Sequence, residues 1–165
     1  MYTNKVKDCL KEGERGERHK GLKKVTPSFV LALNHVKKAE HNFNAIDLFY
    51  KIGYSDWSVS AAFYSLYHLL LAILIKKGFE SRNQSCTFAL IEEMIDSKEI
   101  NLTKEDLKEI FDKDINEDLV HSNKILDFRE NMQYSHKTFL EEKEFELLRQ
   151  RTKVLFNKLR KEIEK

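Results

Sequence analysis

The sequence predicts an all-α fold, an up-and-down bundle of four to five helices built on a long antiparallel helical hairpin. Three observations support this fold class. The 165 residues contain one proline and five glycines, so few positions interrupt a helix. Charged residues make up 34% of the chain and are mostly Lys and Glu, which helices accept readily. Apolar residues recur in several segments at the three- and four-residue spacing of one helix face.

The N-terminal region, residues 1–25, differs in composition from the helical bundle expected over residues 26–165. Met1 to Leu10 can form a short helix, and residues 11–24 contain three glycines and almost no apolar side chain, which indicates a mobile connector. Residues 5–24 carry eight basic and four acidic side chains. Such a basic segment either contacts phosphates or is simply solvated, and the composition leaves both interpretations open.

The predicted hairpin follows this basic region. Thr26 and Pro27 signal the start of the first long helix, because proline is well accepted at the first helical position. A short turn at residues 53–55 leads to a second helix from Asp56 to Lys77, which Gly78 ends. That second helix is apolar nearly all round, so we expect other helices or a second subunit to bury it. One face of the first helix carries Val36, Ala39, Phe43, Ile46 and Tyr50.

Shorter helices are expected after the hairpin. Residues 85–95 form the first of these, and Thr103 with Asp106 resembles a capping box that opens a helix through Phe111. Asn116 can cap the next helix, and the last helix is expected from Phe139 to about Ile163.

Composition also restricts location and cofactors. The longest apolar run, Leu69 to Ile75, is short of the roughly 20 residues of a membrane span, and the N-terminus is charged. We therefore expect a cytoplasmic protein without membrane contact. Cys9 and Cys86 match neither a disulfide framework nor a CxxC motif and are expected to be reduced thiols. The familiar nucleotide-loop and metal motifs are absent, so no cofactor and no metal are expected.

Two residues carry the chemistry of interest. Arg129 and His136 are seven residues apart, and if their helix continues this spacing places both side chains on one face. The residues three and four positions from Arg129 are not acidic, so its partner must come from another helix, another subunit or a ligand. Imidazole can remove the proton of a ribose 2′-OH, and guanidinium can stabilise the charge on the phosphate oxygens. The pair therefore suits metal-independent RNA cleavage, with a two-fold dimer supplying a second histidine.

In two places the sequence resembles the HEPN superfamily of small helical proteins. The first is the hairpin, in which Ala39–Glu40, the small-residue and tyrosine-rich stretch from Ala61 to His68, and Gly78 follow the family pattern. The second is Arg129 to His136, which fits the family's arginine, four to six residues, histidine pattern. The two places fall within residues 33–160, over which the resemblance extends.

The resemblance implies a homodimer with paired Arg and His at its interface and, in many members, metal-independent ribonuclease activity. Many of those members are toxins paired with a minimal nucleotidyltransferase. Arg129 would bind phosphate and His136 would act as general acid or base, while Glu130 occupies the polar position after the arginine. Asn123, Tyr134 and His68 are auxiliary candidates, and for His68 a structural role in the core is the alternative.

Three functions remain open from the sequence. The first is a dimeric ribonuclease, the toxin of a toxin-antitoxin pair, with RNA as substrate. The second is a non-catalytic helical partner of a minimal nucleotidyltransferase, or a nucleotide-binding module. The third is a structural bundle in which Arg129 is held by a carboxylate.

Overall fold

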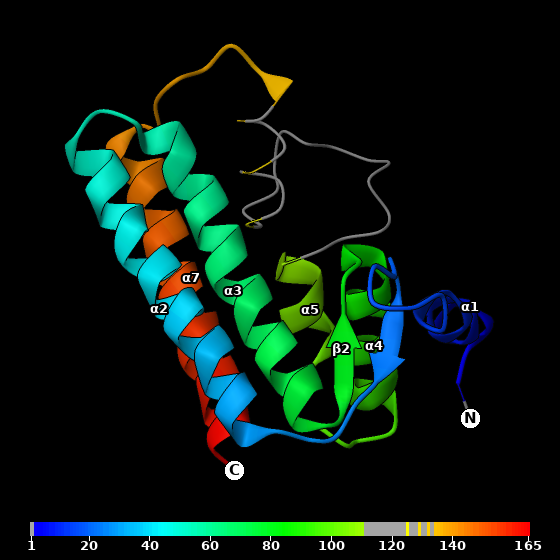
Figure 1. The fold of residues 1–165 in the computed structure, drawn as a ribbon. Coiled ribbons are helices and arrows are strands. Elements are labelled where there is room, and N and C mark those ends of the chain that lie inside the picture. Colours follow the sequence, from blue (N-terminus) through cyan, green and yellow to red (C-terminus); the bar gives the residue numbers. More distant parts are fainter. Residues whose placement is uncertain (1, 111–124, 126–128, 130–131, 133) are drawn as a thin grey trace.

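The computed structural model describes residues 2–110, 125, 129, 132 and 134–165. Three long helices pack together, and the smaller elements gather against one of them, α3 (Ser55–Lys76), on the side away from α2 (Phe29–Lys51) (Figure 1). This arrangement confirms the predicted all-α fold built on a helical hairpin. The long helices are α2 (Phe29–Lys51), α3 (Ser55–Lys76) and α7 (Glu142–Glu164), and the shorter ones are α1 (Asn4–Gly13), α4 (Gln84–Asp96) and α5 (Lys104–Ile110).

The α2–α3 hairpin begins and ends at residues with clear local causes. The backbone N–H of Leu31 donates to the Oγ of Ser28 over 3.2 Å, so α2 starts at Phe29, two residues after the predicted proline. The turn between the helices contains Gly53 with φ of +84°, and Gly78 follows α3 with φ of +87°. Glycine accepts this left-handed backbone without steric cost, which explains both breaks.

Helix α3 is the central element of the fold. It packs against α2 and α7 along its length and against α4 and β2 near its second half. The Ser58 hydroxyl donates to the carbonyl of Ile46 over 2.7 Å, and the Lys76 ammonium donates to the carbonyl of Ile163 over 2.7 Å. Among the described residues α3 alone has the length and composition of a membrane span, but 72% of that stretch is buried inside the protein. Burial on this scale is typical of a core helix.

A two-stranded antiparallel sheet was not predicted. Strand β1 (Leu22–Lys24) pairs with β2 (Phe79–Ser81), with Leu22 opposite Ser81 and Lys24 opposite Phe79. The side chain of Leu22 is fully buried, so this part of the expected connector belongs to the packed structure. Each strand has three residues, which is too short for an alternating pattern to reveal a strand in the sequence.

Cys9 of α1 and Cys86 of α4 form a disulfide, with their Cα atoms 5.8 Å apart. The expectation of two reduced thiols is therefore wrong. The two cysteines are 77 residues apart, and the sequence shows no spacing that joins them. They meet because α1 packs against α4, where both side chains are buried. The predicted boundary at residues 25 and 26 stays a prediction.

The C-terminal half confirms one capping signal and shifts one start. Thr103 and Asp106 form the predicted capping box, with each backbone N–H donating to the other side chain over 2.8 and 3.1 Å. Helix α7 starts at Glu142, three residues later than expected, after the N-cap residue Glu141, whose backbone is extended. The helix that Asn116 was expected to cap lies outside the described residues.

Candidate functional site around Arg129

Arg129 lies on helical backbone and its side chain rests against α3. Its guanidinium carbon is 4.1 Å from the centroid of the Phe63 ring and 5.8 Å from that of Tyr64. Phe63 is fully buried, whereas the Tyr64 side chain is 39% exposed. The cation therefore lies at the edge between the core and solvent, where attraction to the ring faces holds it. Among the described residues α3 supplies these ring contacts, and another helix was one of the three sources of a partner that the sequence left open.

His136 is exposed and lies on a bend beyond Tyr134, which is the last described residue with helical backbone before α7. The sequence argument placed the two side chains on one face on the condition that the helix continues to His136, and this condition is not met. The reason is local: Ser135 and His136 form a bend, and the chain then continues without regular secondary structure to Leu140. The imidazole is instead carried by a connecting segment.

Two contacts fix this connecting segment, residues 135–140, to the bundle. The Lys137 ammonium lies 2.7 Å from a carboxylate oxygen of Glu144 in α7. The backbone N–H of Leu140 donates to the Oγ of Ser55, at the start of α3, over 2.7 Å, and both residues are buried. His136 thus lies in a segment that is attached to both α3 and α7.

His68 pairs with a histidine that the sequence analysis did not name as a candidate. Its Nδ1 is 3.1 Å from Nδ1 of His35 in α2, and the two rings are stacked with centroids 5.4 Å apart. One ring must donate and the other accept, so at least the accepting imidazole is neutral. His35 could have been noticed because it lies on the helix that pairs with the helix of His68. Only the register in which α2 and α3 pack shows that the two rings meet.

Burial lowers the pKa of both histidines. The pKa of His68 falls to about 4, chiefly because the side chain is partly withdrawn from water and secondly because His35 and Lys38 lie close. Burial also lowers the pKa of His35. Both rings are therefore uncharged near neutral pH. His68 follows Tyr64 by one turn of α3, so the pair lies about 6 Å along the helix from the ring that Arg129 contacts.

The other auxiliary candidates fall in different places. Tyr134 is 81% exposed and has helical backbone. Asn123 and Glu130 lie outside the described residues. Within the described ranges no group of three or more His, Cys, Asp or Glu side chains is placed to hold a metal ion.

Helix α3 also presents a partly exposed stripe. Trp57 and Tyr64 are 54% and 39% exposed, and His68 and Leu71 are half-buried on the same side. Their spacings of seven, four and three residues keep the four side chains within about 60° around the helix axis. The stripe passes directly beside the Arg129 guanidinium at Tyr64.

The fold and the position of Arg129 define the class of protein. It is a helical-hairpin bundle with a cation beside the exposed edge of its central helix. The family model of the HEPN domain matches residues 32–162 of the chain. The protein belongs to the HEPN family. The match begins inside α2, so α1 and β1 lie before it. No curated protein matches the chain.

Proposed function

We propose that this HEPN protein is a metal-independent endoribonuclease that acts as a homodimer, with Arg129 and His136 as its active pair. The observation that carries the proposal is the position of the Arg129 guanidinium, 4.1 Å from the buried Phe63 ring and beside the exposed Tyr64 ring. A cation kept at this edge can bind a phosphate without leaving its support on α3.

The proposed reaction is a transfer within the RNA strand. The ribose 2′-oxygen bonds to the adjacent phosphorus while a neutral imidazole takes its proton, and the bond to the 5′-oxygen breaks. That leaving oxygen receives a proton from a second, protonated imidazole, and the products carry a 2′,3′-cyclic phosphate and a 5′-hydroxyl. Arg129 stabilises the charge on the non-bridging oxygens during the transfer.

A second copy of the chain would complete this site. The exposed stripe Trp57, Tyr64 and Leu71 offers apolar area for an isologous contact between two α3 helices. A two-fold contact there brings both Arg129 side chains to one groove and supplies the second His136. The proposed location is the cytoplasm, and the proposed biological setting is a toxin with a nucleotidyltransferase antitoxin.

The test measures cleavage of labelled RNA in the presence of a chelator, together with the molecular mass in solution. We expect wild-type dimers to cleave, and His136→Ala and Arg129→Gln to lose at least about 100-fold in rate, the usual size of an acid–base contribution. His41→Ala, an exposed histidine on α2, is the matched control and should keep full activity. Activity that survives His136→Ala would refute the assignment.

One observation favours the non-catalytic alternative. Because His136 lies on a bend outside the helix, helical geometry does not align it with Arg129. A helical partner of a nucleotidyltransferase needs only a surface and no aligned pair. Absence of cleavage together with a stable complex with a neighbouring nucleotidyltransferase would support this alternative.

A further inference from the structure

The N-terminal residues 4–24, here named the α1–β1 unit, are held against the bundle by several independent contacts. The Cys9–Cys86 disulfide joins α1 to α4, and β1 pairs with β2. The buried ring of His19 lies 3.5 Å from the carboxylate of Glu80, and Arg82 donates to the carbonyl of Glu17. The basic segment of the sequence therefore has a fixed shape.

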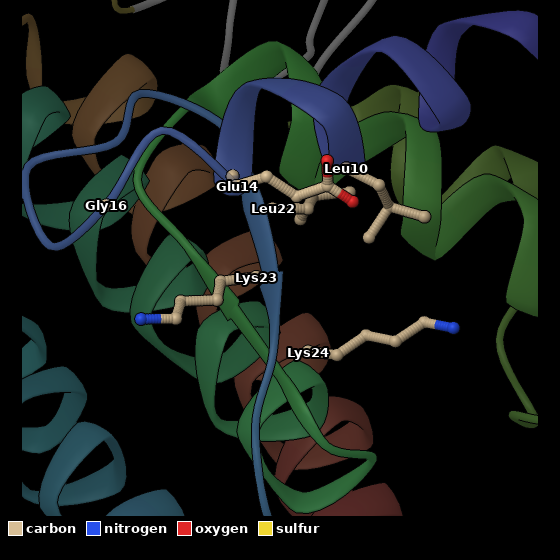
Figure 2. A pocket seen from close by; sticks show the side chains of 7 residues that line it. Leu10, Glu14, Gly16, Leu22, Lys23 and Lys24 are labelled. Carbon is tan, nitrogen blue, oxygen red and sulfur yellow. The ribbon is translucent and has the colours of Figure 1, made fainter.

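A hollow of about 370 Å³ opens between the end of α1 and β1. Figure 2 shows the Lys23 and Lys24 side chains leaving β1 on opposite sides of it, with the Glu14 carboxylate near its upper wall. The half-buried Leu10 supplies its apolar side chain, and Leu22, whose side chain is fully buried, lies beneath it. Gly13 makes the wall possible, because a Cβ there would lie 1.7 Å from the carbonyl oxygen of Leu22.

The charges around this hollow are available to a ligand. Lys23 and Lys24 are exposed and form no ion pair with any described residue, although the Lys24 ammonium lies 5.8 Å from the Tyr2 ring. Residues 5–24 together carry eight basic and four acidic side chains. Among the described residues, one of these acids, Glu12, is already engaged by Arg15 at 2.9 Å.

The shape and charge of the hollow select a ligand with three parts. Two ammonium groups on either side suit two successive phosphates, and the apolar part suits a flat ring of nucleobase size. The Glu14 carboxylate repels a phosphate from the hollow itself but accepts hydrogen bonds from an amino group. Adenine and cytosine carry such a group and uracil does not.

We propose that the α1–β1 unit binds one nucleotide of single-stranded RNA, with its base in the hollow beside Glu14 and its flanking phosphates on Lys23 and Lys24. This proposal rests on the proposed function for the choice of RNA as partner. It adds a binding surface before the HEPN match, separate from the Arg129 site. The surface would hold substrate strand outside the site of cleavage.

The test uses the full chain carrying His136→Ala, so that binding is measured without cleavage. Fluorescence anisotropy is recorded with labelled A12 and U12 RNA at several salt concentrations. For Lys23→Gln/Lys24→Gln we expect about 20-fold weaker A12 binding at 0.1 M salt, and a log-log salt slope reduced by about 1.4, because two phosphate contacts are lost. Lys153→Gln/Lys161→Gln on α7 removes two exposed lysines as the matched control and should bind like the parent.

Glu14→Ala tests the base. The parent is expected to prefer A12 over U12, and the variant to lose that preference while it keeps the salt slope. If the Lys23/Lys24 and Lys153/Lys161 variants lose the same amount of RNA affinity, binding is general charge attraction and the proposal is overturned. Equal affinity of the parent for A12 and U12 would also overturn it. If RNA binds as expected while wild type does not cleave, the proposed ribonuclease function fails and this inference stands. If wild type cleaves RNA while the Lys23 and Lys24 variant binds RNA normally, the proposed ribonuclease function stands and this inference fails.

Discussion

The guanidinium carbon of Arg129 lies 4.1 Å from the centroid of the Phe63 ring. This contact joins α3 to a residue that is distant from it in the sequence. It fixes the position of the guanidinium in the candidate site. Each partner alone has an ordinary role, a core aromatic and a partly buried arginine. Together they give a partly buried cation that lies over a ring of the core.

Phe63→Leu tests this support. The variant keeps an apolar core side chain but removes the ring face, so we expect Arg129 to lose its position and RNA cleavage to fall about 10-fold, the equivalent of roughly 1.4 kcal/mol. Phe156→Leu, a buried ring on α7 packed against Phe43, is the control for core loss alone. Equal loss of rate per folded molecule in the two variants would contradict a special role for Phe63.

Ser55→Ala tests the attachment of the segment that carries His136. The change leaves the buried N–H of Leu140 without its acceptor, which costs about 1 to 3 kcal/mol of unfolding free energy. We expect faster hydrogen exchange at the Leu140 amide and a lower urea midpoint. Ser58→Ala removes a buried hydroxyl that is a donor to Ile46 of α2, and it should leave exchange at Leu140 unchanged.

Acid should destabilise the protein through the His35–His68 pair. The pKa of His68 in the folded protein is about 4 and that of His35 is also lowered, both below the value near 6.5 of an unfolded chain. Between these limits the unfolded state binds more protons, so the free energy of unfolding is at its full value above pH 6.5 and declines as the pH falls toward 4.

Thermal unfolding of wild type and His35→Gln/His68→Gln from pH 7 to 4.5 measures this effect. The double variant should lose less of its melting temperature over that range than wild type. His41→Gln, on the exposed side of α2, should follow wild type. Parallel curves for wild type and the double variant would show that the pair does not control acid stability.

Reduction of the Cys9–Cys86 disulfide should lower stability substantially. The bond closes a loop of 77 residues, and the chain-entropy treatment assigns such a loop about 4.5 kcal/mol. For a chain of this size we expect the melting temperature to fall by about 10 °C in reductant. Cys9→Ser/Cys86→Ser should melt at the lower temperature and show no response to reductant.

The state of this bond inside cells also tests the proposed location. Cytosolic thiols are kept reduced, whereas disulfides persist in oxidising compartments. Trapping with an alkylating mass tag, followed by electrophoresis, separates the two states. A fully oxidised bond in growing cells would contradict the cytoplasmic proposal.

Much of the fold could be predicted because its signals are local. The three- and four-residue apolar spacing of α2, the glycines that follow α2 and α3, and the Thr103 capping box each act within one or two turns. The missed features all join distant segments. The β1–β2 pair has three residues a strand, and the disulfide unites cysteines whose spacing carries no signal.

The candidate site was predicted in part for the same reason. The need of Arg129 for partners on another helix follows from its neighbours, but the identity of Phe63 depends on packing. His35 could not be chosen over the other histidines, because its contact with His68 is set by the register of two long helices. For His136 the periodicity argument assumed a helix that in fact ends before it.

The disulfide turns most of the N-terminal half of the chain into a covalent ring. Residues 9–86 form this ring, which includes the whole α2–α3 hairpin. A protease that cuts once inside it, for example in the turn at Gly53, would leave a nicked molecule and not two separate fragments. When the two ends of the chain are pulled, the disulfide carries the force and the residues inside the ring are not stretched. Roughly 270 Å of chain therefore cannot be extended until the bond is reduced.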